Sequence, residues 1–281
     1  FGQSFAGLSW LQALLSIFVM VLPTFLMGLL FPLVSDLVTG RLAHLGQRLG
    51  LVYAANTLGG IFGSFLSGFW LIPQVGIAWT LVIAAMVNLV AGLLLHVRFS
   101  PFGLVRRVSF AIGAVVVYLG MSRWLFVPLW QRQVLTAGVY LAPDLYRDVS
   151  VEDAVKDNEL LFYRESLNAT VSVHRNARNN DLSLKVGGKT DASTGIDMGT
   201  QVLAAHIPLL LHRNPQRVLV IGLGSGVTLG SVGRYPVSTL HCAEIEPAVV
   251  EGARYFAEQN YHIHDDPRVK IYTVDGRNFL L

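Results

Sequence analysis

A glycine-rich turn that follows an apolar segment is the strongest chemical signal in this sequence. Residues 217–221 read as a buried strand, and a short helix is expected from Val227 onward. The turn between them contains Gly222, Gly224, Ser225 and Gly226. Glycine tolerates positive φ angles and lets the main chain come close to a ligand. The pattern is G-x-G-x-G, because Val227 stands where the dinucleotide fingerprint needs a glycine.

Two acidic residues are placed to complete a nucleoside site. Glu244 ends the next predicted strand, and Asp275, followed by Gly276, ends the third. An acid in the position of Glu244 can accept hydrogen bonds from both ribose hydroxyls, and Asp275 would lie within reach of the base. This set favours S-adenosylmethionine or a related nucleoside over NAD.

Glu246 is the alternative for the ribose contact, because it shares a strand face with Glu244. Pro247 follows it and is expected to open a helix, which suits Glu246 as the helix cap. The spacing from the glycine turn favours Glu244. The histidines show no zinc-ligand spacing with the single cysteine, Cys242, so no metal site is expected.

Alternating strands and helices must position these groups. Strands are predicted over 217–221, 239–245 and 269–274, with helices over 227–234 and 247–259. This β-α-β-α-β order predicts a Rossmann-like parallel sheet of the class I methyltransferase type, with its site at the carboxyl ends of the strands. We expect the domain to be truncated and to continue beyond Leu281.

A smaller β unit and a helix precede this sheet. Short strands are predicted over 160–163, 169–174 and 182–186, closed by Gly187 and Gly188. A helix is expected over 200–212, where apolar residues recur at helical spacing.

The first half of the chain has the composition of a membrane domain. Of the 281 residues 53% are hydrophobic and only 14% charged, with a mean hydropathy of +0.52, which excludes a disordered chain and an ordinary cytosolic globule. Apolar stretches of about 20 residues, each long enough to cross a bilayer, cover about 5–34, 49–72, 77–97 and 108–130. We therefore expect a multi-span helical domain over 1–130, a connector and β unit over 131–190, and a partial nucleoside-binding domain over 191–281.

The second apolar stretch carries a face of small residues. Ala55, Gly59, Gly63 and Ser67 recur every four positions, a pattern that lets two helix backbones approach closely. We expect this face to pack against a neighbouring helix. A homo-oligomer is compatible with this pattern.

The distribution of charge bears on topology and partners. Residues 1–130 hold six arginines and one acid, 6 − 1 = +5, and residues 131–281 carry 15 − 17 = −2. The basic excess follows the membrane half and gives no case for nucleic-acid binding. The arginines of 35–48 and 98–107 favour the cytoplasm, which conflicts with a cytoplasmic C-terminal half if all four stretches cross. Either 108–121 does not cross, or a preceding segment sets the orientation; we expect the soluble half on the cytoplasmic side of the inner (plasma) membrane.

Several ordered motifs in residues 160–281 are similar to those of the spermidine synthase (polyamine aminopropyltransferase) family. Residues 182–188 resemble its L-x-L-D-G hairpin, and Gln201 with 206–208 resembles its Q-E-M-x-x-H-x-P helix. The matches further along the chain are 218–226 with G-G-G-D-G, 244–246 with E-I-D, 266–269 with D-P-R-V, and 275–276 with D-G. Residues 53–59 are similar to the Y-A-x-N-T-x-G helix of the family's membrane-fused bacterial branch.

The resemblance implies a membrane-anchored transferase. It would move an aminopropyl group from decarboxylated S-adenosylmethionine, a co-substrate rather than a tightly bound cofactor, to a polyamine such as putrescine. Glu244 would hold the ribose and Asp275 the adenine, with Asp191 and Gln201 at the polyamine. The family's proton-accepting aspartate is expected after Leu281, so the 281 residues alone are expected to be inactive.

Three residues depart from the family pattern. Ser225 stands in place of Asp, Asp191 in place of Gln, and Thr200 in place of Tyr. These changes keep two alternatives open: S-adenosylmethionine-dependent methyl transfer, and a non-catalytic membrane module that binds a nucleoside or a polyamine.

Overall fold

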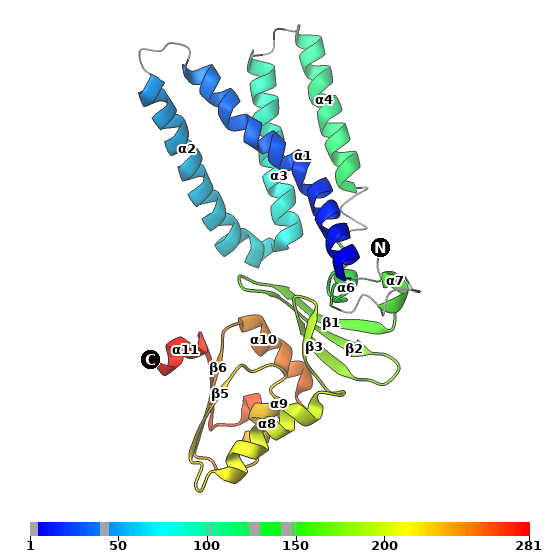
Figure 1. Ribbon diagram of the computed structural model, residues 1–281, viewed down its shortest axis with the longest axis vertical. Coiled ribbons are helices and arrows are strands. Elements are labelled where there is room, and N and C mark those ends of the chain that lie inside the picture. The colour runs from blue at the N-terminus through cyan, green and yellow to red at the C-terminus, as the bar shows by residue number, and fades with distance from the viewer. Residues whose placement is uncertain are drawn as a thin grey trace. The chain divides into compact units, whose positions relative to one another are not determined.

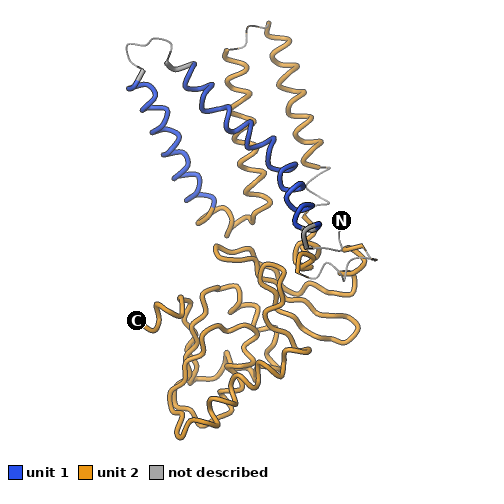
Figure 2. The backbone as a smooth tube through the Cα atoms, in the orientation of Figure 1, with its two compact units in different colours: residues 1–67 blue, residues 68–281 orange. Residues whose placement is uncertain are grey.

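The computed structural model describes residues 5–39, 45–99, 101, 103–123, 130–141, 148 and 150–281. Part of the basic segment 35–48 and most of 122–130, at the end of the fourth apolar stretch, therefore lie outside the described residues. The chain forms two compact units, residues 1–67 and 68–281 (Figure 2). This division does not coincide with the domain boundaries predicted at residues 130 and 190, which stay a prediction.

The described residues of the first unit form two apolar helices, α1 (Phe5–Thr39) and α2 (Leu45–Leu66). The rings of Phe31 and Tyr53 join them, with centroids 4.5 Å apart. Side chains built on Gly59 or Gly63 would meet no described atom of this unit within 4 Å. The close packing predicted for the small-residue face is therefore absent from the described part of this unit.

The second unit begins with further apolar helices. A π-helical turn, η2 (Ser67–Leu71), leads into α3 (Ile72–Phe99), and α4 (Leu104–Met121) follows. Gly76 interrupts α3 near its start, with φ +84° and ψ 168°. The Tyr118 hydroxyl donates to the carbonyl oxygen of Val82 over 3.2 Å and ties α4 to α3.

Within the described residues, three apolar helical stretches are long enough to cross a membrane: Ser9–Asp36, Gly46–Phe99 and Leu104–Met121. The second contains both α2 and α3, so it covers two of the four predicted stretches. The fourth ends as a regular α-helix at Met121, and its 18 residues give a length of about 27 Å. That is close to the hydrocarbon thickness of a bilayer.

An antiparallel sheet follows two short helices in the second unit (Figure 1). The elements are α6 (Arg132–Leu135), α7 (Val151–Ala154), β1 (Asn158–Glu165), β2 (Thr170–Asn176), β3 (Leu182–Val186) and β4 (Lys189–Ser193), and the strand order is β1-β2-β3-β4. The prediction that Gly187 and Gly188 close the unit was wrong. These glycines, with φ of +58° and +84°, turn the chain into β4.

The two faces of this sheet differ because side chains alternate along a strand. Val171, Val173 and Leu184 are fully buried in the hydrophobic core shared with the α/β part. The opposite face carries Ser172 and His174, which are also buried.

A three-stranded parallel sheet completes the second unit, as predicted. Its strands are β5 (Arg217–Ile221), β6 (Thr239–Glu244) and β7 (Val269–Thr273), in that order. The helices are α8 (Met198–Leu211), α9 (Val227–Gly233), α10 (Pro247–Gly252), η5 (Ala253–Phe256), η6 (Ile263–Asp265) and α11 (Gly276–Leu280). The helix predicted over 247–259 is regular only to Gly252 and continues as the 3-10 turn η5.

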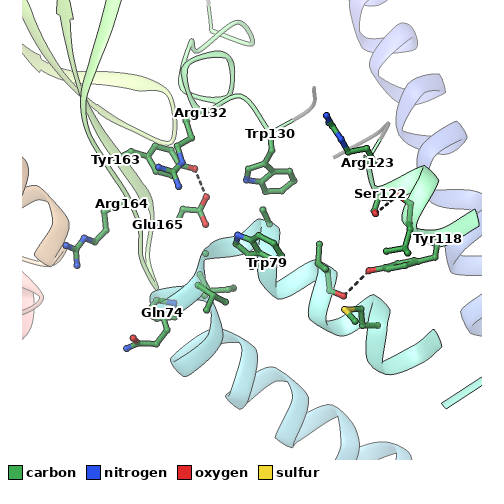
Figure 3. A pocket seen from close by; sticks show the side chains of 18 residues that line it. Gln74, Trp79, Tyr118, Ser122, Arg123, Trp130, Arg132, Tyr163, Arg164 and Glu165 are labelled. Carbon is green, nitrogen blue, oxygen red and sulfur yellow. Dashed lines mark hydrogen bonds between the residues drawn. The ribbon is translucent and has the colours of Figure 1, made fainter. Parts of the chain in front are cut away.

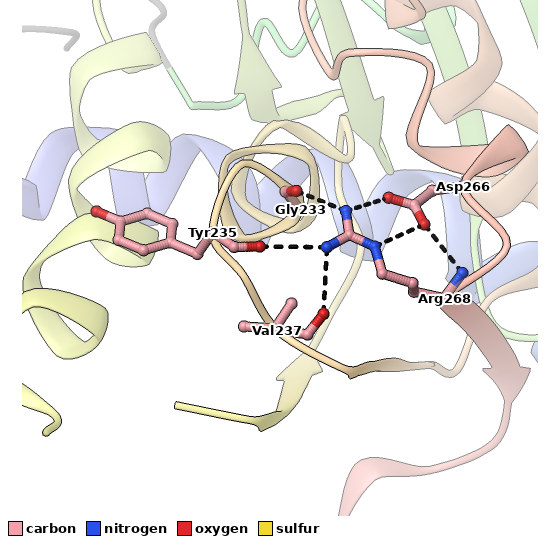
Figure 4. A network of polar contacts seen from close by, with 5 residues as sticks. All are labelled: Gly233, Tyr235, Val237, Asp266 and Arg268. Carbon is pink, nitrogen blue, oxygen red and sulfur yellow. Dashed lines mark hydrogen bonds and ion pairs between the residues drawn. The ribbon is translucent and has the colours of Figure 1, made fainter. Parts of the chain in front are cut away.

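Arg268 fixes the connection into β7 (Figure 4). Its guanidinium donates to both carboxylate oxygens of Asp266, at 3.0 and 2.6 Å. It also donates to three carbonyl oxygens, that of Gly233 at the end of α9 and those of Tyr235 and Val237 after it. One side chain thus holds the end of α9 and the approach to β6 against the start of β7.

Candidate functional site

The predicted nucleoside-binding residues meet at the carboxyl edge of the parallel sheet. The amide of Gly222 donates to Ala243 O over 2.8 Å, which places the start of the glycine turn beside the end of β6. The amide of Val274 donates to Glu244 O over 3.0 Å, which places Asp275 beside Glu244. Residues that are far apart in the sequence are therefore neighbours at one edge.

The glycines of the turn have different surroundings. Gly222, Gly224 and Gly226 all have positive φ, at +85°, +56° and +81°, which confirms the conformational part of the prediction at each. A Cβ at Gly226 would lie 3.0 Å from the side-chain nitrogen Nδ2 of Asn260, whereas one at Gly222 would meet no described atom within 4 Å. Gly226 is enclosed by protein, and Gly222 borders open space that a ligand can occupy.

The carboxylate of Glu244 is nearly buried, with 7% of the residue exposed, and it joins the turn to its own strand. Its Oε2 accepts from the amide of Leu223 at 2.7 Å, and its Oε1 accepts from the amide of Glu246 at 2.9 Å. Each carboxylate oxygen has a further lone pair. Glu244 can therefore hold the glycine turn and still accept from a hydroxyl group.

Glu246 caps α10, as predicted. Its Oε1 accepts from the amide of Ala248 at 3.0 Å. The residue is 3% exposed, and its Oε2 has no hydrogen-bond partner among the described residues. Glu244 contacts the glycine turn and Glu246 the helix start, so the two acids have separate structural roles.

Ser225 and Gln201 are joined by a hydrogen bond of 2.5 Å in which the hydroxyl donates to the amide oxygen. The amide nitrogen of Gln201 donates to Ser193 O at 2.7 Å and to Asp197 Oδ2 at 3.2 Å. Gln201 therefore connects the glycine turn with the end of β4. The side chain predicted to contact substrate is engaged within the protein, and its contact with a substrate stays a prediction.

Asp191 lies on a separate element from Asp275 and Gly276. Asp191 is on β4, is exposed and pairs with Lys189 over 3.1 Å. Asp275 caps α11 by accepting from the amide of Asn278 at 3.0 Å. A Cβ on Gly276 would approach Ile221 Cγ2 to 2.5 Å, so glycine is needed there for packing.

Sequence reasoning missed Asn260, whose side chain holds the glycine turn through a hydrogen bond. Its side chain is fully buried and donates to Ser225 O at 3.0 Å and to Ala253 O at 2.9 Å. A polar residue within the expected loop gave no signal for this role. Within the described residues, no group of histidine, cysteine and acidic side chains could hold a metal ion.

The comparisons concern the same part of the chain. Residues 198–281 match the family model described as the spermine/spermidine synthase domain. The chain is similar to a spermidine synthase of Dictyostelium discoideum, with 34% identity over 98 residues that cover 34% of each protein. It is also similar to a polyamine aminopropyltransferase of Serratia proteamaculans, with 40% identity over 80 residues that cover 28% of each.

Among solved structures, the crystal structure of spermidine synthase from Thermotoga maritima aligns with 27% identity and a TM-score of 0.41, covering 43% of each chain. The present chain spans about a third of the length of the curated relatives that it matches. The segment that matches the spermine/spermidine synthase domain, residues 198–281, contains the glycine turn, Glu244 and Asp275.

Proposed function

We propose that this chain is part of a membrane-anchored aminopropyltransferase whose donor is decarboxylated S-adenosylmethionine and whose acceptor is a polyamine such as putrescine. The observation that carries the proposal is the hydrogen bond from Leu223 to Glu244. It holds the glycine turn against an acid at the end of the next strand, within a segment of the spermine/spermidine synthase domain. That acid can accept hydrogen bonds from the ribose hydroxyls, and the open space beside Gly222 can hold the nucleoside.

Each set of site residues is assigned to a different part of the two substrates. Glu244 accepts from the ribose hydroxyls, and Asp275 with Gly276 lies at the adenine. Gly222, Gly224, Ser225 and Gly226 form the wall of main chain beside the donor. Asp191 and Gln201 lie on the side of β4 and α8, where we place the polyamine.

The reaction needs positioning more than covalent help. The acceptor amine attacks the carbon next to the sulfonium; a C–N bond forms, the C–S bond breaks, and methylthioadenosine leaves. The amine must give up its proton to a base. Binding both substrates at one edge of the sheet supplies the orientation that this displacement requires.

The apolar helices support an anchor in the inner (plasma) membrane, with the soluble part in the cytoplasm. The described residues include apolar helical stretches of spanning length in α1, across α2 and α3, and in α4. Placing the soluble part in the cytoplasm gives it access to a nucleotide-derived donor.

A second function, methyl transfer from S-adenosylmethionine, is favoured by one observation. The turn offers the neutral hydroxyl of Ser225, which is bonded to Gln201, and no carboxylate at this position. The ammonium group of the decarboxylated donor would gain from an acid there. The intact donor carries its own carboxylate and would not.

Calorimetry on the 281-residue chain in detergent tests both functions. The three ligands are decarboxylated S-adenosylmethionine, S-adenosylmethionine and methylthioadenosine. We expect all three to bind, with the decarboxylated donor tightest. Tighter binding of the intact donor would select methyl transfer, and failure of all three to bind would contradict the nucleoside site.

A further inference from the structure

A cavity lies within residues 68–281 (Figure 3). It has a volume of about 1020 Å³ and lies among α3, α4, β1 and the segment that leads into α6. That volume is at the upper end of the range for small-molecule sites. None of the nucleoside-site residues lines it.

One wall of the cavity is apolar and follows a single face of α3. Trp79, Val82 and Met86 line it after the Gly76 interruption, at spacings of three and four residues, and side chains with such spacings share one face of a helix. Val75, just before the interruption, also lines the cavity. Leu119 of α4 faces the same space. These residues belong to helices with the length and composition of membrane spans, so this wall suits an acyl chain.

The other end of the cavity is cationic. Arg123 and Arg132 line it, both exposed, and neither pairs with an acid among the described residues. The guanidinium of Arg132 lies over the Tyr163 ring, 4.9 Å from its centroid. Both guanidinium groups can therefore donate hydrogen bonds to an anionic ligand.

The other charged side chains that line the cavity, Arg164 and Glu165, have partners within the protein. Arg164 points away from the cavity in Figure 3 and pairs with Glu251 of α10 over 2.8 Å. Glu165 accepts from the Tyr163 hydroxyl at 2.5 Å and from the amide of Ile77 beside the Gly76 interruption. These neutral donors hold the Glu165 carboxylate in place without cancelling its charge, and the two arginines outnumber this one acid at the cavity.

Aromatic residues surround the change from apolar to charged lining. Trp79, Tyr118 and Trp130 all line the cavity (Figure 3). Tryptophan and tyrosine are enriched at the level of lipid headgroups. The cavity thus combines an apolar wall, aromatic rings and two arginines, the three kinds of group that suit a phospholipid.

We propose that this cavity binds an anionic phospholipid, with its phosphate at Arg123 and Arg132 and an acyl chain along α3. The proposal rests on the membrane anchor of the proposed function and is independent of the nucleoside. Basic pockets beside membrane helices on the cytoplasmic side are suited to anionic headgroups.

Tryptophan quenching on the full 281-residue chain in a nonionic detergent tests the site. The probes are phosphatidylglycerol and phosphatidylcholine with the same brominated acyl chains. We expect phosphatidylglycerol to quench at a concentration at least about tenfold lower, from two arginines near one headgroup. The Trp79→Phe variant should lose most of the difference between the lipids, because Trp79 lies on the acyl wall.

Matched variants separate this site from general charge attraction. Arg123→Gln with Arg132→Gln should bring the two lipids to equal effect, whereas Arg123→Lys with Arg132→Lys should keep most of the preference. Arg98→Gln with Arg106→Gln removes the same charge outside the cavity and should leave the preference unchanged. The thermal midpoint of each variant, measured in the same detergent, shows that it is folded.

Three results would overturn the proposal: equal quenching by both lipids in the parent chain, an equal loss in the Arg98 and Arg106 variant, or a selective effect retained without Arg123 and Arg132. Inorganic phosphate alone is the second arm, and it should not change the thermal midpoint. If phosphate raises the thermal midpoint as much as phosphatidylglycerol does, the ligand is a small anion instead. Nucleoside binding is measured separately, so failure here leaves the proposed enzyme function untouched.

Discussion

The amide of Leu223 donates to the Glu244 carboxylate over 2.7 Å, although 21 positions separate the two residues in the sequence. The bond fastens the middle of the glycine turn to the end of β6. The acid that we assign to the ribose therefore also shapes the turn that borders the ligand. Binding and local structure are coupled through one side chain.

Replacing Glu244 with Gln should weaken nucleoside binding at least about tenfold. The amide keeps the shape but loses the charge, and charge-assisted hydrogen bonds are about twice as strong as neutral ones. Its NH₂ group would also face one of the two amides that now donate to the carboxylate. Calorimetry with methylthioadenosine on the 281-residue chain measures the change.

Glu246→Gln is the matched control for this prediction. Its remaining carbonyl oxygen can still accept from Ala248, so the cap of α10 should persist. We expect nucleoside affinity to change by less than about twofold, which corresponds to a few tenths of a kcal/mol. A larger loss from Glu246→Gln than from Glu244→Gln would show that the ribose acid is misassigned.

The elements around Glu244 could be predicted because their signals are local. An apolar run ending in glycines gives β5 and its turn, and Pro247 after Glu246 gives the cap of α10. β4 could not be predicted in this way. Its residues Lys189–Ser193 show no apolar alternation, and only pairing with β3, as in Leu184 with Ala192, makes them a strand.

The packing around the site needed the folded chain. Ser225 bonds Gln201 across 24 positions, and Asn260 reaches Ser225 across 35. No spacing rule connects residues that far apart. The face of small residues around Gly63 is the opposite case. Its spacing is a strong local signal for helix packing, but no described atom of its unit lies close to it.

Arg268→Lys should lower the stability of the α/β part by about 1–3 kcal/mol, because lysine cannot reproduce the planar fork of donors. Three carbonyl oxygens and Asp266 depend on that fork (Figure 4). Denaturation in urea, followed by circular dichroism, measures the loss. Arg178→Lys is the control, because its pair with Asp157 is exposed and should matter little. Equal losses from the two variants would contradict the role given to Arg268.

The single cysteine, Cys242, should resist alkylation while the chain is folded. Burial on β6, with a smaller effect from the charge of Glu244, raises the pKa of the thiol from 9.0 to about 12. Only the thiolate reacts, so at pH 8 the reaction with iodoacetamide should be roughly a thousandfold slower than in the unfolded chain. Mass spectrometry with and without denaturant checks this. Rapid labelling of the folded chain would show that β6 is open to solvent.

Stability should fall on acidification because of His174. Burial, with a smaller contribution from the charge of Lys185, lowers the pKa of this imidazole from 6.5 to about 4. Its Nε2 lies 3.0 Å from Ser172 Oγ, and its Nδ1 has no partner among the described residues. A second ring proton would therefore be buried without an acceptor.

The sign of the effect follows from proton binding. Between pH 6.5 and pH 4 the unfolded chain binds a proton at His174 that the folded chain does not, so stability is complete above pH 6.5 and is lost as the pH falls toward 4. The total loss from this group is roughly 3 kcal/mol. His174→Gln keeps a neutral polar side chain beside Ser172 and removes the titration. Urea denaturation at pH 7 and at pH 4.5 should show that the parent loses more stability than the variant, and parallel losses in the two proteins would contradict the assignment.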